Sequence, residues 1–286
     1  MAHVERFAPS PTGLLHLGHA FSALTAWDRS QAAGGEFLLR MEDIDSARSK
    51  QEYVDAIFKD LSWLGISWPR PVMLQSTRMS AYQSALLQLG KLGVTYRCDC
   101  TRRDIADALS APQEGVQIGP DGPVYPGTCK SRNILDEHAA IRLNMEAAIE
   151  LLGSQPITFE ELGEGPNAET GRIVTSAEQM ISGIGDIVLA RKDIGTSYHL
   201  SVVVDDAAQK VTHVTRGEDL FEATPIHRVL QNLLRLVEPR YFHHRLIRDA
   251  NGKRLAKRDD SRAIRKYRAD GASPQDIRKM VGLNHR

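Results

Sequence analysis

The fold is indicated by residues 4–41, which read VERFAPSPTGLLHLGHAFSALTAWDRSQAAGGEFLLRM. Residues 4–8 alternate in polarity as a strand does, and a turn-rich segment follows at 9–13. Residues 14–33 predict a helix that ends at Gly34 and Gly35, and Phe37–Met41 predict a second strand. Two strands joined in this way by a helix run parallel and form a βαβ unit. The sequence therefore predicts an α/β fold with a buried sheet.

Outside this unit the pattern divides the chain into four parts. Residues 1–95 would form the first half of the main domain, including a helix with a Ser49/Glu52 capping box. Residues 96–185 are rich in Pro and Gly and predict an insertion. Residues 186–250 would complete the sheet, with an apolar run at 200–204, a strand at 211–215 and a helix through 237 capped by Thr224 with Pro225 at its first position. Residues 251–286 hold a basic stretch and a terminal helix that begins near 273.

Composition limits the possible partners and compartment. The 286 residues carry 36 Lys and Arg against 36 Asp and Glu, so binding to a nucleic acid would need locally concentrated positive charge. No apolar stretch is long enough to span a membrane, and the N-terminus lacks a signal-peptide core, so we expect a cytoplasmic protein. The three cysteines lie in one segment, which favours a metal site over disulfides.

Two histidines open the first predicted helix, in the sequence His16-Leu17-Gly18-His19. A helix N-terminus offers backbone N–H groups and a positive dipole end, both of which suit a phosphate. Histidines three apart share one helix face and can donate hydrogen bonds to phosphoryl oxygens, and Gly18 would let a flat nucleotide approach the backbone. The alternatives are a pair of surface histidines or half of a metal site.

A second candidate phosphate ligand lies near the C-terminus, in Arg254-Leu255-Ala256-Lys257-Arg258 after an Asn-Gly turn. A lysine on a flexible loop can close over a polyphosphate and neutralise the charge that develops in a transition state. Alone, such a segment is more often a solvated basic loop.

Together these segments resemble the class I glutamyl-tRNA synthetases over about residues 4–260. The resemblance also rests on residues 6–13, 40–45 and 205–219. It implies a Rossmann-like class I catalytic domain with a zinc-containing insertion and a short helical C-terminal segment. His16-Leu17-Gly18-His19 would correspond to the HIGH signature and 254–258 to KMSKS, in which Arg254 replaces the first lysine and Ala256 the serine. The residues implied for catalysis and ATP binding are His16, Gly18, His19 and Lys257, with Mg²⁺ accompanying ATP.

The resemblance also implies a pocket for L-glutamate. Arg6 and Arg216 would hold its side-chain carboxylate, with Tyr198 as a hydroxyl partner and Glu42 facing the ammonium; Ala8 and Ser10 would line the pocket. An arginine suits the carboxylate because its planar guanidinium binds it through two hydrogen bonds. Taken alone, each arginine is as well explained by a surface ion pair.

The cysteine segment offers Cys98, Cys100 and Cys129, whereas tetrahedral zinc needs four ligands. From chemistry alone, His138 is a conventional fourth ligand, and three buried reduced cysteines without metal are the alternative. Tyr125 precedes Cys129 by four residues, and this pattern resembles the zinc-binding set of a short branch of the family, the glutamyl-queuosine tRNA(Asp) synthetases. The branch implies a structural zinc held by Cys98, Cys100, Tyr125 and Cys129.

That branch attaches glutamate to the queuosine at the wobble position of tRNA(Asp), and we expect the chain to have no room after residue 258 for an anticodon-binding domain. We therefore expect ATP-dependent activation of glutamate followed by this transfer, by a monomer. A basic run would meet the RNA, unless it is simply a solvated face: Lys253, Arg254, Lys257, Arg258, Arg262, Arg265, Lys266 and Arg268. The alternatives are a truncated glutamyl-tRNA synthetase that charges tRNA(Glu) and a non-catalytic regulator that binds glutamate or RNA.

Overall fold

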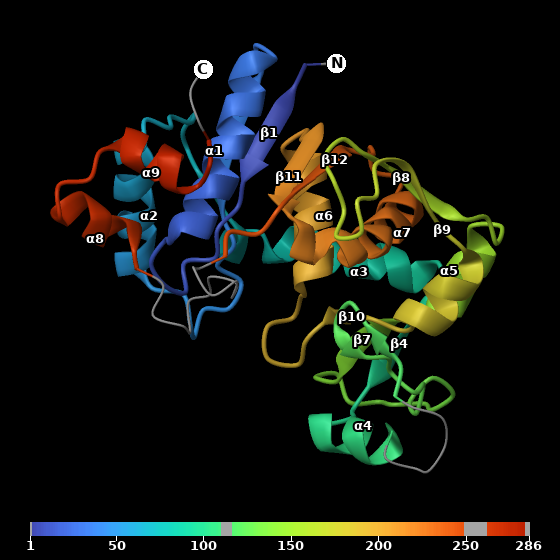
Figure 1. Cartoon of the computed structure of the whole chain (residues 1–286). Coiled ribbons are helices and arrows are strands. Elements are labelled where there is room, and N and C mark those ends of the chain that lie inside the picture. Colours follow the sequence, from blue (N-terminus) through green and yellow to red (C-terminus); the bar gives the residue numbers. More distant parts are fainter. Residues whose placement is uncertain (1, 110–115, 249–261, 284–286) are drawn as a thin grey trace.

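The computed structural model describes residues 2–109, 116–248 and 262–283. Its main element, among these residues, is a seven-stranded sheet with the order β3-β2-β1-β11-β12-β8-β9 (Figure 1). All neighbouring pairs are parallel except β8 and β9. The strands are β1 (Val4–Phe7), β2 (Glu36–Met41), β3 (Met73–Leu74), β8 (Ile157–Glu161), β9 (Gly171–Thr175), β11 (His213–Gly217) and β12 (Arg240–His244). The predicted α/β fold is confirmed.

Helices cover both faces of this sheet, and alternation along β1 shows which side each helix takes. Phe7 packs in one core with helices α1 (Leu17–Ala32) and α2 (Gln51–Trp63). The preceding residue, Arg6, instead bonds Asp206 of α6 (Tyr198–Ala208). Because neighbouring strand residues point to opposite faces, α1 and α6 lie on opposite sides of the sheet. A second core joins α6 with α3 (Met79–Lys91), α5 (Met145–Leu151) and α7 (Thr224–Leu234).

A separate small sheet holds the region of the cysteines. It has the order β10-β7-β4, with β4 (Thr95–Cys98), β7 (Ala140–Leu143) and β10 (Val188–Ala190), and it lies below the main sheet in Figure 1 beside α4 (Arg102–Leu109). A hairpin of β5 (Ile118–Gly119) and β6 (Gly122–Pro123) belongs to the same region. Residues 157–175, which fall within the insertion expected at 96–185, instead supply β8 and β9 to the main sheet. The part that departs from the main domain is thus shorter than expected.

Two local predictions, both about helix ends, were wrong. Helix α2 begins at Gln51 with Lys50 before it, and the Ser49 hydroxyl is buried without a hydrogen bond instead of forming a capping box. The apolar run at 200–204, for which the sequence pattern does not choose between strand and helix, lies in α6. Helix α7 includes Thr224 as a helical residue and ends at Leu234, where Arg235 takes a left-handed conformation.

The C-terminal helices α8 (Ile264–Ala269) and α9 (Pro274–Met280) pack against α2 and α1. Ile264 and Ile277 are fully buried in the core of the first two helices. The start of α9 has the capping box that a helix near residue 273 requires, formed by Ser273 and Asp276. No helix within the described ranges is both long and apolar enough to cross a membrane.

Candidate active site

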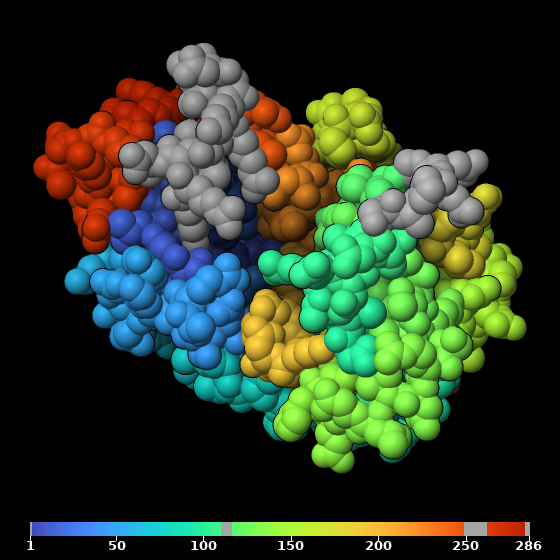
Figure 2. All heavy atoms as spheres, turned by 90° about the horizontal axis from the view of Figure 1, so that it is seen from below, coloured from blue at the N-terminus to red at the C-terminus, as the bar shows by residue number. Residues whose placement is uncertain are grey.

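The strand order changes direction between β1 and β11: β2 and β3 follow β1 on one side, and β12 follows β11 on the other. In parallel α/β sheets, ligands bind beyond the carboxyl ends of the strands at such a switch point. A cavity of about 530 Å³ lies there. Seen from below, the surface is hollowed between the blue N-terminal residues and the orange and green parts of the chain (Figure 2). All nine expected pocket residues in the described ranges line this cavity: Arg6, Ala8, Ser10, His16, Gly18, His19, Glu42, Tyr198 and Arg216.

The register of the sheet brings Arg6 and Arg216 to this one cavity. The neighbouring parallel strands β1 and β11 are aligned through Glu5 and His213, and the Arg6 guanidinium donates through Nη1 to the carbonyl of Thr215 at 3.2 Å. Both arginines are 5% exposed. Two buried guanidinium groups from strands that are far apart in the chain therefore face the same space.

Among the described residues, only neutral acceptors hold Arg216. It donates through Nε to His243 (3.0 Å), through Nη1 to His227 (3.2 Å) and through Nη2 to Thr224 (2.6 Å). Burial and the nearby Arg216 charge lower the pKa of His227 well below its ordinary value, and they lower that of His243 to about 4 despite its bond to Glu161. No carboxylate in the described part of the chain forms an ion pair with this guanidinium. Three of its five N–H donors are thus used, which leaves one on each terminal nitrogen for a bidentate anion.

Arg6 differs because a carboxylate already faces it. Its Nε donates to Asp206 at 3.2 Å, and the same oxygen accepts from Arg40 Nη1 at 2.7 Å. Burial would raise the pKa of Asp206, but the charges of Arg6 and Arg40 outweigh it and hold the pKa below its usual value. Arg40 also donates to Glu42 at 3.3 Å. The two arginines are therefore not equivalent: Arg6 belongs to an ion-pair network, and Arg216 carries a charge open to an added anion.

Glu42 and Tyr198 supply the other polar groups of this wall. Glu42 follows the last residue of β2, and burial raises the pKa of its carboxyl even though Arg40 and Arg6 lie nearby. A bound ammonium would lower that pKa again and keep the carboxylate charged. Tyr198 is the first residue of α6, which is capped by Ser197; burial raises the pKa of its phenol, so the hydroxyl stays a neutral donor.

His16 and His19 are fixed by the helix that they begin. The His16 ring accepts the backbone N–H of Gly18 through Nδ1 (3.1 Å), and the His19 ring accepts that of His16 through Nδ1 (3.1 Å). A neutral imidazole that accepts through Nδ1 carries its proton on Nε2, so both rings are Nε2–H donors. A Cβ on Gly18 would lie 3.0 Å from Cε1 of His16. The glycine thus makes room for the His16 ring, whereas sequence alone suggested room for a nucleotide.

The second predicted phosphate ligand, Lys257, lies outside the described residues, as do Arg254 and Ala256. The next described cations along the chain, Arg262, Arg265 and Lys266, line a groove of about 950 Å³ that shares His16 with the cavity. Ile264 N bonds the carbonyl of Leu15, so this end of the chain is joined directly to the turn before α1. The last cation of the basic run, Arg268, instead pairs with buried Asp60 of α2 at 3.2 Å.

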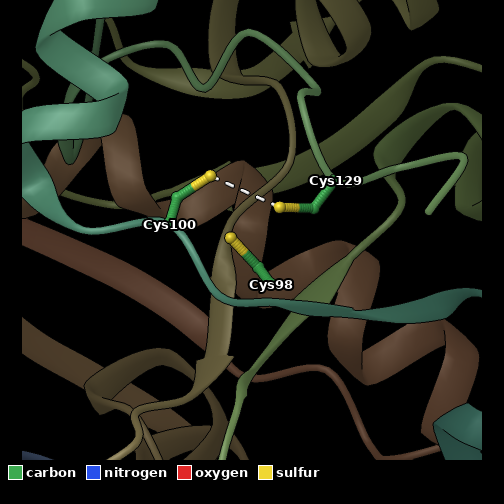
Figure 3. A group of neighbouring side chains, drawn as sticks. All are labelled: Cys98, Cys100 and Cys129. Atoms are coloured by element: carbon green, nitrogen blue, oxygen red, sulfur yellow. Dashed lines mark hydrogen bonds between the residues drawn. The ribbon is translucent and has the colours of Figure 1, made fainter. Parts of the chain in front are cut away.

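The three cysteines converge in the small sheet's region. Their sulfur atoms all lie within 4.8 Å of one another, and Figure 3 shows them pointing toward a common centre. Cys100 and Cys129 are 3.3 Å apart, and none of the three forms a disulfide. Burial alone would raise the pKa of the Cys98 thiol, but its hydrogen bonds with Tyr125 and Arg142 outweigh it and lower the pKa to about 7. Three thiols in this arrangement could hold a metal ion.

The hydroxyl of Tyr125 lies beside the three thiols, where a fourth ligand would stand. Its hydroxyl oxygen lies 3.4 Å from the sulfurs of both Cys98 and Cys100. With Zn–S of about 2.3 Å and Zn–O of about 2.0 Å, a tetrahedral site would place oxygen and sulfur about 3.5 Å apart. The donor set therefore fits zinc. His138, the conventional guess from chemistry, is exposed and is not part of the cluster.

Several residues of the site went unrecognised in the sequence. His227, His243 and Thr224 hold Arg216, and Arg40 and Asp206 hold Arg6. Arg40 and Asp206 lie in the segments 40–45 and 205–219, and a charged residue in such apolar surroundings could have indicated a buried ion pair. The two histidines gave none, because His227 lies within the apolar face of a helix and His243 on a buried strand.

Comparison with known proteins agrees with this geometry. Residues 3–284 match the family described as tRNA synthetases class I (E and Q), catalytic domain. A glutamyl-Q tRNA(Asp) synthetase from Rhodobacter capsulatus is 57% identical, over 98% of this chain and 100% of the relative. Those from Nitratidesulfovibrio vulgaris and Deinococcus radiodurans are each 38% identical, over 97% and 100% of this chain and 85% and 89% of the relatives.

Solved structures show the same fold. A glutamate-tRNA synthetase from Elizabethkingia anophelis superposes with a TM-score of 0.77 at 23% identity, and one from Elizabethkingia meningosepticum, in complex with its amino acid, with 0.75 at 24%. Each comparison covers 99% of this chain, which spans 61% of the length of each of those structures. The chain therefore belongs to the class I tRNA synthetases for glutamate and glutamine, and it is a ligase of the branch whose relatives are called glutamyl-Q tRNA(Asp) synthetases.

Proposed function

We propose that this chain activates L-glutamate with ATP and transfers the glutamyl group to the queuosine at the wobble position of tRNA(Asp). The observation that carries the choice of amino acid is Arg216, a buried guanidinium that no described carboxylate pairs. A buried charge without a partner is unfavourable, so the site favours a ligand that brings an anion to it. Glutamine would leave the charge unpaired, and sites of this type reject such a misfit strongly.

The remaining polar groups are assigned by their charge. The glutamate side-chain carboxylate would bind Arg216, with Arg6 and the Tyr198 hydroxyl beside it, and Glu42 would receive the α-ammonium. Ala8 and Ser10 would line the same wall. Because Arg6 is shared with Asp206, we assign most of the carboxylate's binding energy to Arg216.

The proposed reaction needs no nucleophilic side chain. An oxygen of glutamate's α-carboxylate bonds to the α-phosphorus of ATP, and the bond to the β-phosphate bridging oxygen breaks, which gives glutamyl-adenylate and pyrophosphate. A hydroxyl of queuosine then takes the acyl group and AMP leaves. The protein's part is positioning and charge stabilisation: the Nε2–H groups of His16 and His19 would donate to the phosphates, Gly18 would leave space for the His16 ring, and Lys257 would neutralise the departing pyrophosphate.

Two metal ions are part of the proposal. Mg²⁺ would arrive with ATP. One structural Zn²⁺ per chain would be held by Cys98, Cys100, Cys129 and Tyr125, whose separations suit tetrahedral coordination. Its contribution would be to stabilise an insertion that has little hydrophobic core of its own.

The choice of tRNA is supported by the names of the relatives, which match along almost the whole chain. The basic groove next to His16 offers cations for an RNA backbone within reach of the cavity. We propose that the enzyme acts as a monomer, which light scattering of the purified chain in the presence and absence of tRNA would test.

The decisive experiment has two stages. Glutamate-dependent ATP–pyrophosphate exchange without tRNA should be well above that with glutamine, and its absence would refute the activation step. Labelled glutamate should then become attached to tRNA(Asp) that contains queuosine and not to the same tRNA with guanine at the wobble position. Transfer to the 3′ end of tRNA(Glu) instead would contradict the proposed acceptor.

A further inference from the structure

Arg216 is connected to the surface of the insertion by a line of hydrogen-bonded side chains. His227 of α7 lies 3.2 Å from Arg216, between Nδ1 and Nη1. Its Nε2 lies 3.1 Å from Nδ1 of His199, the second residue of α6. The other nitrogen of His199, Nε2, meets both carboxylate oxygens of Asp121 at 3.0 and 2.9 Å. Asp121 stands in the turn between β5 and β6, so the line runs from the insertion to the cavity wall.

The two ends of this line fix the direction of every hydrogen bond in it. Arg216 can only donate, so Nδ1 of His227 accepts and the His227 proton lies on Nε2. That proton is donated to Nδ1 of His199, whose own proton therefore lies on Nε2 and is donated to Asp121. The carboxylate can only accept at neutral pH: partial burial would raise the pKa of Asp121, but the interaction with His199 outweighs it and holds the pKa below its ordinary value. One set of neutral tautomers thus satisfies all three contacts.

A shorter arm approaches Arg216 from the other side. His243 accepts from Arg216 Nε through Nε2 and faces Glu161 through Nδ1 at 2.5 Å. Each arm places a carboxylate at its far end and a neutral imidazole against the guanidinium. This arrangement compensates the buried charge from a distance, while the edge of the guanidinium stays open to the cavity.

We propose that Asp121, His199 and His227 are positioning residues for Arg216, so that the metal-binding insertion takes part in recognising the substrate carboxylate. The inference rests on the proposed function, in that the substrate is glutamate. His199 and His227 are 5% and 2% exposed, whereas the Asp121 side chain is 54% exposed, so a change at the outer end of the line disturbs the core least.

The hydrogen bonds of this line hold Arg216 only when each group donates toward Asp121. If His199 could no longer accept from His227, the His227 proton could move to Nδ1 and face the N–H of Arg216, two donors in opposition. Arg216 would then lose a charge-assisted contact and rotate from its place in the cavity. The loss of such a contact corresponds to about tenfold or more in affinity. A comparable carboxylate–histidine pair fixes the tautomer in serine proteases, where replacing the aspartate by asparagine greatly lowers the rate.

A pair of substitutions at His199 separates polarity from packing. In His199→Gln the amide oxygen can accept from His227 and the amide N–H can donate to Asp121, so the direction is preserved. In His199→Leu the volume is kept and the direction is lost. We expect His199→Leu to raise the KM for glutamate about tenfold in ATP–pyrophosphate exchange with the KM for ATP unchanged, and His199→Gln to stay within about threefold of wild type.

Asp121→Asn covers the case in which His199→Leu does not fold. Its side chain is half exposed and its amide can present N–H groups to His199, so the fold should persist while the KM for glutamate rises about fivefold. Asp136→Asn is the matched control, since Asp136 is exposed in the same insertion and, among the described residues, its side chain bonds the backbone N–H of His138 alone. That variant should behave as wild type.

The outcomes are distinguishable. An unchanged glutamate KM in Asp121→Asn, or an equal rise for glutamate and ATP in folded His199→Leu, would overturn the positioning role. A wild-type enzyme that activates no glutamate would instead refute the proposed function. Independently of any substrate, ¹⁵N NMR of labelled histidine should show His199 and His227 as neutral Nε2–H tautomers, and an Nδ1–H form of either would overturn the inferred direction.

Discussion

Replacing Arg216 by alanine tests the site most directly. Arg216 is 5% exposed, and its three hydrogen bonds to described residues go to His243, His227 and Thr224, all uncharged acceptors. With the arginine gone, the carboxylate of bound glutamate would be buried without a cation, and breaking a buried pair in this way costs ~3–5 kcal/mol. We therefore expect kcat/KM for glutamate to fall roughly 10²- to 10⁴-fold.

The fold should tolerate this change. Three hydrogen bonds are lost, worth ~1 kcal/mol each. This loss is offset because the variant no longer buries the Arg216 charge, which lacks a carboxylate partner among the described residues. Arg216→Lys keeps the charge but not the planar fork, so its activity should lie between those of alanine and wild type. Arg240→Ala, on the adjacent strand β12, is the control, since the Arg240 side chain is 57% exposed and its one ion pair within the described ranges is with exposed Glu160.

The assay is glutamate-dependent ATP–pyrophosphate exchange, with circular dichroism to verify the fold of each variant. A natively folded Arg216→Ala enzyme with kcat/KM within threefold of wild type would show that the substrate carboxylate lies elsewhere. An equal loss in Arg240→Ala would mean that the effect is not specific to the cavity.

Three further changes probe other parts of the molecule. Gly18→Ala places a Cβ 3.0 Å from the His16 ring, so the KM for ATP should rise about tenfold while thermal stability is kept. An unchanged KM would show that the His16 ring does not contact the phosphates. Tyr125→Phe should weaken zinc retention in a chelator competition, and equal retention would exclude the phenol as a ligand. Burial outweighs the nearby Arg268 and raises the pKa of Asp60 from 3.8 to about 6. The free energy of unfolding therefore falls as pH rises from 3.8 to about 6, because the unfolded chain gives up this proton more readily than the folded protein does. Between pH 4 and pH 7, the free energy of unfolding of Asp60→Asn, measured in urea, should therefore rise by ~2 kcal/mol relative to that of wild type. A difference that does not depend on pH would contradict this.

The sequence alone determined the features that are local in the chain. The strand, turn and helix of residues 4–33 follow from alternation, from Pro and Gly, and from a glycine pair at the helix end, and the structure has them within a few residues. Short motifs with fixed spacing, such as His16 with His19 and Cys98 with Cys100, also pointed to residues that the fold brings into the cavity and into the cysteine cluster. These signals depend on neighbours in sequence, which is why they could be read without a fold.

Only the tertiary structure decided how distant residues share the work. Arg6 and Arg216 looked alike in sequence, and their difference arises because α6 brings Asp206 to one of them while α7 and β12 bring neutral histidines to the other. The electrostatic state of a buried charge depends on every group packed around it, and those groups come from segments up to 200 residues apart in the chain. Sequence spacing carries no information on that packing, so the open charge of Arg216 became visible only in the folded protein.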